Sequence, residues 1–192
     1  MSEPLRLILA TRNAHKLAEI QRMRPDILWL ALPETLPDPP ETQDTFEGNA
    51  LQKARFVYEA TGITALADDS GLEVDALGGR PGVWSKRYSP EGSDAANNAL
   101  LLKELEGKSQ RSARYRCVLA LVGFDGEATV DGRCEGTIAH DLRGQNGFGY
   151  DPLFIPVASP ERRMAELSAT EKDAISHRGA AMAHFQELCP CK

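Results

Sequence analysis

Two adjacent aspartates are the residues of this sequence whose types and spacing most clearly suggest chemistry. Asp68 and Asp69 follow an apolar run ending in Ala65–Ala67, which is typical of a buried strand, and Ser70-Gly71 comes next. Neighbouring carboxylates are costly to desolvate unless a cation or hydrogen-bond donors meet them. Side chains alternate along a strand, so the two should face opposite ways if the strand continues through both. We expect the strand to end here, giving either a metal-phosphate site or a polar turn between strands.

A polar segment between a predicted strand and a predicted helix offers a second chemical group. The strand covers Arg6–Ala10, and apolar residues recur at helical spacing from Leu17. Thr11 or Asn13 can cap this helix, and N–H groups at a helix start attract anions. Lys16 is disfavoured there by the helix dipole unless an anion is near. The segment hints at phosphate binding, although it lacks the glycines of a Walker A loop.

A third group surrounds the start of the next predicted helix. After a predicted strand at residues 27–32, a proline-rich loop over residues 33–43 contains Glu41, and Asp44-x-x-Glu47 resembles a capping box. Asn49 and Lys53 are four residues apart, which places them on one helical face. Lys53 is therefore either a functional residue that shares this face with Asn49 or a solvated surface lysine.

Further elements follow from apolar periodicity and turn signals. Strands are predicted at 72–77, 113–124 and 153–155, and one or two more at 127–139, after a hairpin turn at Asp125-Gly126. Helices are predicted from Ser93 or Asp94 to Leu105 and over 169–188, the latter opened by a capping box at Ser168-x-x-Glu171.

A glycine- and aromatic-rich loop could lie against a flat ligand. It contains Phe148, Gly149, Tyr150 and Asp151. Aromatic faces stack on bases, and an aspartate or a backbone group can read a base edge. Within the last predicted helix, three cationic or hydrogen-bonding side chains lie within two turns and can hold a phosphate or a carbonyl oxygen: Lys172, His177 and Arg178.

Composition narrows the class of protein. A chain of 192 residues with 42% apolar and 26% charged residues is ordinary for a soluble globular protein of one domain or two lobes. A net charge of −6 argues against broad binding to nucleic acid or anionic membranes. No apolar run is long enough for a membrane span or a signal peptide, so we expect a cytoplasmic protein. In that reducing compartment all four cysteines, Cys117, Cys134, Cys189 and Cys191, are expected as free thiols.

The motifs occur in one order: Thr11-x-Asn13-x-x-Lys16, Glu41, Asn49-Ala50-x-x-Lys53-Ala54, Ala67-Asp68-Asp69-Ser70-Gly71, Phe148-Gly149-Tyr150-Asp151-Pro152 and Ser176-His177-Arg178. Together they resemble the inosine triphosphate pyrophosphatase family, also called dITP/XTP pyrophosphatases, from about residue 7 to about residue 188. The resemblance implies an elongated α/β fold, with helices flanking a mixed sheet, in one domain of two lobes with a central cleft. It also implies a homodimer that uses magnesium to cleave deaminated purine nucleoside triphosphates to the monophosphate and pyrophosphate, which keeps them out of DNA and RNA.

The resemblance also assigns roles to residues of this chain. It implies a triphosphate loop of Thr11, Arg12, Asn13, Ala14, His15 and Lys16 and magnesium ligands at Glu41 and Asp69. Asp69 matches the proton acceptor, Lys53 and Asp68 match catalytic polar residues near the phosphates, and Ser70 matches a substrate contact. Base recognition falls to Phe148, Gly149, Tyr150, Asp151, Lys172, His177 and Arg178. Gly48 stands where many members have an acidic residue, and Glu47 is not expected to replace it as a metal ligand.

Three alternatives compete with this interpretation. A nucleotide-binding regulator without turnover is disfavoured by the intact set of Lys16, Glu41 and Asp69. A related pyrophosphatase that prefers pyrimidines is disfavoured by the segments at 148–151 and 176–178. Nudix chemistry is disfavoured because its acidic helix signature is missing from the sequence.

Overall fold

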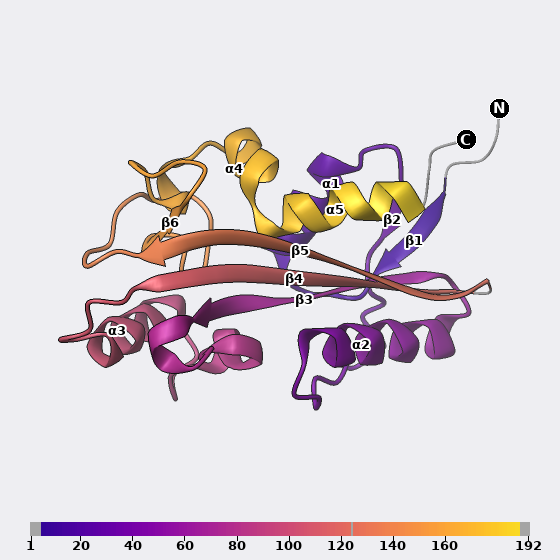
Figure 1. Cartoon of the computed structure of the whole chain (residues 1–192). Coiled ribbons are helices and arrows are strands. Elements are labelled where there is room, and N and C mark those ends of the chain that lie inside the picture. The colour runs from indigo at the N-terminus through magenta and orange to yellow at the C-terminus, as the bar shows by residue number, and fades with distance from the viewer. Residues whose placement is uncertain (1–4, 124, 189–192) are drawn as a thin grey trace. The chain divides into compact units, whose positions relative to one another are not determined.

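The computed structural model describes residues 5–123 and 125–188, which form a mixed α/β fold (Figure 1). The sheet has the strand order β2-β1-β3-β4-β5-β6. β1 pairs in parallel with β2 and β3, whereas β5 pairs antiparallel with β6. The prediction of a mixed sheet flanked by helices is confirmed. The strands are β1 (Arg6–Leu9), β2 (Leu28–Leu30), β3 (Ala65–Val74), β4 (Ser112–Gly123), β5 (Gly126–Ile138) and β6 (Phe154–Pro156).

Five α-helices and three short 3-10 helices are interspersed with these strands in the described residues. The α-helices are α1 (Ala14–Met23), α2 (Phe46–Thr61), α3 (Asp94–Glu104), α4 (Ala169–Ile175) and α5 (His177–Leu188). The 3-10 helices are Asp75–Leu77, Gly82–Arg87 and Met164–Glu166. Among the helices of the described residues, none has the length and apolar character needed to cross a membrane.

The chain divides into two compact units. Of the described residues, unit 1 contains 5–69, 117–123, 125–132 and 181–188, and unit 2 contains Ser70–Arg116 and Arg133–Ala180. The strands β3, β4 and β5 each contribute residues to both units. The prediction of one domain with two lobes and a cleft stays a prediction.

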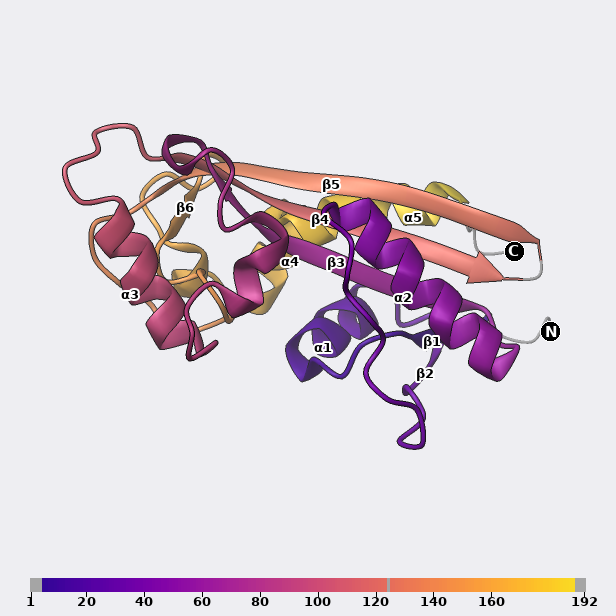
Figure 2. The ribbon, with the colours of Figure 1, turned by 90° about the horizontal axis from the view of Figure 1, so that it is seen from below.

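In unit 1, alternate residues of the strands face two different helical layers. Leu7, Leu9 and Leu66 pack in one apolar cluster with Ile20 of α1 and Phe185 of α5. The other face of the strands is covered by α2, as the two views agree (Figures 1 and 2). The apolar stripe of α2 is small and fully buried, which brings this helix close to the sheet: Ala50, Ala54 and Val57.

Unit 2 has its own apolar core. Leu72 and Val74 of β3, Tyr115 of β4 and Phe154 of β6 belong to one buried cluster. Leu101 of α3 packs in the same cluster, so α3 covers these strand segments. Among the described residues, Cys117 and Cys134 are buried and form no disulfide bond, as predicted, while Cys189 and Cys191 lie outside the described residues.

The predicted break at Asp68-Asp69 is wrong, because β3 continues from Ala65 to Val74 through the acidic pair. Asp68 and Asp69 therefore lie in the middle of a strand and not at its end or in a turn. The strand can continue because cations balance both carboxylates, as described below. The strand predicted for residues 72–77 is also wrong at its end, where Asp75–Leu77 forms a 3-10 helix.

Two helix boundaries differ from the predictions. Thr45, not Asp44, caps α2, with its side chain accepting a hydrogen bond from Gly48 N. The predicted helix over residues 169–188 is broken at Ser176, whose ψ of 160° is extended. Its capping box at Ser168 and Glu171 is present as predicted. The break makes His177 and Arg178 the first residues of a new helix, α5.

Candidate functional site

Alternation along β3 directs its two aspartates to different helices of unit 1. Asp68 has the same parity as Leu66, which packs with α1, and Lys16 Nζ from α1 lies 2.5 Å from Asp68 Oδ1. Asp69 has the opposite parity, and Lys53 Nζ from α2 lies 2.8 Å from Asp69 Oδ1. The prediction that the carboxylates face opposite ways agrees with these partners. Each carboxylate has a lysine beside it, which offsets the cost of burying its charge.

Lys53 is the centre of this cluster and is not a solvated surface lysine. Its side chain is 6% exposed, and Nζ donates to Glu41 Oε1 at 2.6 Å and to the backbone oxygen of Asp68 at 2.8 Å, besides Asp69. Asn49, one helical turn earlier, donates from Nδ2 to Asp69 Oδ2 at 3.3 Å. The shared helical face predicted for Asn49 and Lys53 therefore converges on one carboxylate.

Burial and charge shift the pKa values within this cluster. Burial disfavours the charged form of Lys53, but the adjacent Asp69 and Glu41 carboxylates outweigh it and raise the pKa of Lys53. Burial raises the pKa of Asp69, although Lys53 and Lys16 oppose the shift. Lys53 is therefore protonated at neutral pH, and the Asp69 carboxylate is more basic than that of an exposed aspartate.

Asp68 has an additional buried partner that sequence reasoning assigned only to the core. The Cys117 thiol on β4 donates to Asp68 Oδ2 at 3.1 Å, while Lys16 binds Oδ1. Lys16 also approaches the backbone oxygen of Asp68, at 3.4 Å. Both oxygens of this carboxylate are therefore held, which fixes its orientation.

The polar segment before α1 is organised by Asn13. Asn13 is the N-cap of the helix, and its Oδ1 accepts from the backbone N–H groups of His15 and Lys16. Thr11 Oγ1 accepts in turn from Asn13 N. Ala14 and His15 are exposed in the first turn of α1. Asn13 therefore binds the backbone N–H groups of His15 and Lys16, which were predicted from the sequence to attract an anion.

Arg12 points to the proline-rich loop of unit 1. Its Nε donates to Asp38 Oδ1 at 2.8 Å, and Nη2 donates to the backbone oxygens of Pro33 and Leu36. Arg12 therefore fastens the loop over residues 33–43 that contains Glu41.

The predicted base-recognition residues gather within unit 2 around Asp151. Lys172 Nζ lies 2.6 Å from Asp151 Oδ2, and Phe148 N donates to the same oxygen at 3.0 Å. Tyr115 Oη donates to the other oxygen, Oδ1, at 3.2 Å. Lys172 Nζ also lies 4.6 Å from the centroid of the Phe148 ring. Asp151 thus holds the lysine against the aromatic ring that was predicted to stack on a base.

His177 and Arg178 reach this set from the start of α5. The His177 ring is stacked on Tyr115 with 4.6 Å between centroids and 11° between ring planes. Arg178 is fully buried, its Nη2 donates to Ser70 Oγ at 2.9 Å, and its Cζ lies 5.8 Å from the Phe148 ring centroid. The break at Ser176 therefore brings these side chains to one place.

Glycine is required in the loop that carries Asp151. Gly147 has a φ of +74°, and an added Cβ there would lie 2.0 Å from Asp151 Oδ2. Gly149 also has a positive φ, and its N–H donates to Asp94 Oδ2. Tyr150 is buried in the unit 2 core and donates to the backbone oxygen of Ser85 at 2.8 Å, so its side chain anchors the loop.

Glu41 and Asp69 are the side chains that suit a magnesium ion. They carry oxygen ligands and are already joined through the cation of Lys53, and magnesium sites commonly use one or two carboxylates plus phosphate oxygens and water. Over residues 5–123 and 125–188, no cluster of three or more His, Cys, Asp or Glu side chains is arranged to hold a metal. The protein donors therefore fit magnesium only if a ligand supplies the remaining oxygens. Glu47 is exposed, with Thr129 Oγ1 3.5 Å from its Oε1.

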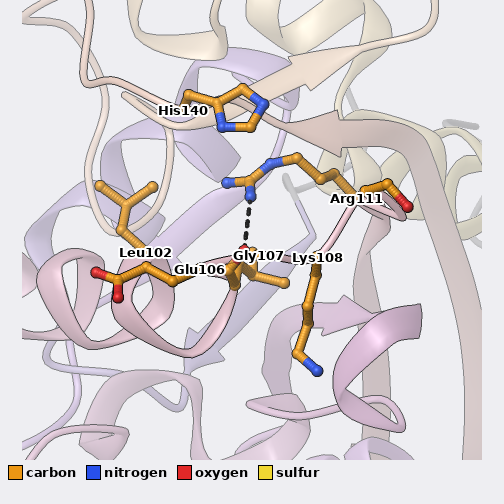
Figure 3. Close-up of a pocket in the computed structure, with 8 residues that line it drawn as sticks. Leu102, Glu106, Gly107, Lys108, Arg111 and His140 are labelled. Carbon is orange, nitrogen blue, oxygen red and sulfur yellow. Dashed lines mark hydrogen bonds between the residues drawn. The ribbon is translucent and has the colours of Figure 1, made fainter.

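A cavity of about 640 Å³ in unit 2 is built from other residues (Figure 3). It lies at the end of α3 and is lined by Leu102, Leu105, Glu106, Gly107, Lys108, Ser109, Arg111 and His140, none of which was predicted as a site residue. Arg111 donates to three backbone oxygens, those of Ile138, Ala139 and Leu105. Arg111 thus ties the end of α3 to the end of β5.

Arg111→Ala is expected to lower the free energy of unfolding by about 2 kcal/mol, because three carbonyl groups lose a charged donor. Urea unfolding measures this change. Arg6→Ala, at an exposed position, is the matched control and should stay within about 0.5 kcal/mol of the unmodified protein. Equal stabilities for Arg111→Ala and the control would contradict the structural role of Arg111.

Tyr115 is the main residue of this region that sequence reasoning missed. It lies on β4, where alternate residues are buried, so its inward orientation was readable from the sequence. Its partners Asp151 and His177 are 36 and 62 positions away, however, and only the fold brings them together.

The fold and the side chains define an α/β protein with two buried, lysine-balanced carboxylates in one unit and an aromatic, cationic set in the other. Comparison with known proteins then makes the assignment specific. The chain belongs to the Ham1 family, whose model matches residues 7–188. This confirms the resemblance inferred from the motifs.

Known relatives are similar over nearly the whole chain. The dITP/XTP pyrophosphatase of Mycobacterium tuberculosis is 50% identical over 188 residues, which cover 93% of this chain and 92% of the relative. The protein of the same name from Geobacter sulfurreducens is 50% identical over 190 residues, covering 95% of each chain. The solved structure of a HAM1 protein from Coxiella burnetii has a TM-score of 0.86 and 44% identity, covering 96% of this chain and 98% of that one.

Proposed function

We propose that this protein is a hydrolase that cleaves ITP, dITP and XTP to the monophosphate and pyrophosphate, keeping these nucleotides out of DNA and RNA. The observation that carries the proposal is the cluster in which the buried Lys53 joins the buried Asp69 to the partly exposed Glu41. Such a cluster combines cations for phosphate, a basic carboxylate and oxygen ligands for a metal. The names of the relatives, dITP/XTP pyrophosphatase, agree with the chemistry of this cluster.

The lysines bind the triphosphate. A nucleoside triphosphate brings about four negative charges, and positioning with charge compensation supplies most of the catalysis in phosphoryl transfer. Lys16 and Lys53 supply the compensating charge, and Asp68 holds Lys16 in place through a 2.5 Å ion pair. Thr11 to Lys16 form the loop that contacts the phosphates, chiefly through the Lys16 side chain, because Asn13 already binds the N–H groups of His15 and Lys16.

Asp69 orients a water molecule and accepts its proton. Burial raises its pKa, which makes it a better base than an exposed aspartate, while the adjacent Lys53 favours its ionised form. The water attacks the α-phosphorus, and pyrophosphate leaves. Hydrolysis in heavy-oxygen water tests this step, since the label is expected in the monophosphate. Label found only in pyrophosphate would overturn the assignment.

Glu41 and Asp69 would hold Mg²⁺ together with phosphate oxygens of the substrate. When bound, the ion neutralises charge on the phosphates and orients them. Lys53 donates to both carboxylates, so its positive charge offsets the repulsion between Glu41 and Asp69 when no metal ion is bound.

The residues around Asp151 select the base. Lys172, His177 and Arg178 can donate to the 6-oxo group of hypoxanthine or xanthine, whereas adenine presents a 6-amino donor there. Unmatched donors in a buried site reject the wrong substrate by on the order of 10⁴-fold. The Phe148 ring stacks on the base, and Ser70 contacts the substrate while accepting from Arg178.

Product analysis with ITP, XTP, dITP, GTP and ATP, with and without Mg²⁺, tests the whole proposal. Pyrophosphate and monophosphate are expected mainly from ITP, dITP and XTP, and removal of Mg²⁺ with EDTA should abolish turnover. Orthophosphate release, or equal rates on ATP and GTP, would contradict the proposed reaction. Binding of ITP without turnover would favour a nucleotide-sensing regulator instead.

We further propose that the protein acts in the cytoplasm as a homodimer. Light scattering on a gel-filtration column measures the oligomeric state, and a mass of 21.0 kDa, that of one chain, would contradict the dimer.

A further inference from the structure

Tyr115 connects two of the side chains that the proposed function assigns to base recognition. Its hydroxyl donates to Asp151 Oδ1 at 3.2 Å, while Lys172 Nζ lies 2.6 Å from Asp151 Oδ2. Its ring is stacked on the His177 imidazole with 4.6 Å between centroids. Tyr115, a buried residue of β4, therefore contacts Asp151, which binds the proposed donor Lys172. It also contacts the ring of His177, a second proposed donor.

Tyr115 is itself held firmly. It is 6% exposed, and the Phe154 ring packs against it with 4.7 Å between centroids and a 55° tilt. Burial, with Asp151 beside it, raises the pKa of Tyr115 well above its ordinary value, so the hydroxyl keeps its proton. The group is thus a permanent donor to Asp151 in a packed environment.

A rigid donor set discriminates better than a mobile one. A donor that can swing aside avoids the unfavourable contact with a 6-amino group and lowers the penalty for adenine. A donor that is fixed by packing and by a second hydrogen bond cannot move away from a 6-amino group, so an adenine base leaves that donor without an acceptor. The residue that locks Lys172 and His177 therefore controls the selectivity as well as the affinity.

We propose that Tyr115 is a positioning residue that sets the preference for 6-oxo over 6-amino purines by fixing Lys172, through Asp151, and His177, through ring stacking. The inference rests on the proposed function, because it concerns the base specificity of that reaction. Tyr115 contacts the recognition residues and not the reacting phosphates, so its role differs from those of Asp69 and Lys53.

Two substitutions distinguish the effect of the Tyr115 hydroxyl on Asp151 from the effect of its ring on His177. Tyr115→Phe keeps the ring and its stacking but removes the hydroxyl, and Tyr115→Leu removes both. Tyr58→Phe, on α2 of unit 1, is the matched control for loss of a tyrosine hydroxyl. Steady-state kinetics of each variant with ITP and ATP gives kcat and KM, and thermal melting shows whether the variants fold.

Tyr115→Phe is expected to lower kcat/KM for ITP about tenfold, mainly through KM, because one hydrogen bond to a charged acceptor is lost. The value of kcat/KM for ATP should fall by less, so the ratio of kcat/KM for ITP to kcat/KM for ATP decreases. Tyr115→Leu should narrow the ratio further, and Tyr58→Phe should leave it unchanged. A purely structural role for Tyr115 would lower both rates equally and keep the ratio.

The outcomes separate this inference from the function it rests on. If the unmodified protein hydrolyses ITP but folded Tyr115→Phe keeps the full ITP:ATP ratio, the positioning role is overturned and the function stands. If the unmodified protein does not hydrolyse ITP, the proposed function fails and the positioning role fails with it. A narrowed ratio in a folded variant supports both.

Discussion

Asp69→Asn is expected to lower kcat for ITP by about 10²–10⁴-fold while leaving ITP binding measurable, because the amide cannot accept the proton of the attacking water. The substitution preserves the size of the side chain and can keep the hydrogen bond from Lys53, so folding should be retained. Stopped-flow or coupled pyrophosphate assays measure kcat, and calorimetry with ITP and Ca²⁺ in place of Mg²⁺ measures binding.

Asp44→Asn is the matched control, since Asp44 is exposed in the same unit and precedes the N-cap of α2. Its kcat should match that of the unmodified protein. A near-normal kcat for Asp69→Asn would remove Asp69 from the role of proton acceptor. Loss of kcat together with loss of all ITP binding would instead make Asp69 a binding residue.

Lys53→Met should destabilise the protein by about 3 kcal/mol, because removal of one partner from a buried ion cluster leaves uncompensated charge. The Glu41 and Asp69 carboxylates, 2.6 Å and 2.8 Å from Nζ in the native protein, then repel each other. If these two side chains bind Mg²⁺, millimolar Mg²⁺ should stabilise Lys53→Met more than it stabilises the unmodified protein, because the ion replaces the missing cation.

Urea unfolding with and without Mg²⁺ measures both effects without any need for turnover. Lys103→Met, at an exposed position of α3, is the control and should show neither effect. A Lys53→Met protein as stable as the control would contradict the clustered charges. Destabilisation without any extra response to Mg²⁺ would argue against Glu41 and Asp69 as the metal ligands.

The order and type of most elements could be predicted because apolar periodicity and turn residues determine them locally. The continuation of β3 through Asp68-Asp69 could not, because it depends on cations distant in sequence: Lys16 and Lys53 make the charges tolerable within a strand. The break between α4 and α5 was also missed. The apolar residues keep helical spacing through Ser176, so the sequence predicts one continuous helix. In the structure, Ser176 Oγ accepts from Gly179 N, and an added Cβ at Gly179 would lie 1.8 Å from Asp173 O.

The candidate site was predictable where its residue types were distinctive and less so where packing decides. Lys53 and Asn49 were placed on one helical face by spacing, and the structure brings both to Asp69. Tyr115 carries no motif, and only the pairing of distant segments reveals its contacts with Asp151 and His177. A residue that acts through other side chains has no signature of its own in a single sequence.

The consecutive placement of Asp68 and Asp69 on β3 has a consequence for how the protein matures after synthesis. A slip of this strand by one position relative to β1 would turn every side chain to the opposite face of the sheet. Asp68 would then face α2 and Asp69 would face α1, so each carboxylate would meet the wrong lysine. A misregistered chain could retain secondary structure and compactness and still be inert, which makes the return of activity during refolding a reporter of correct strand alignment.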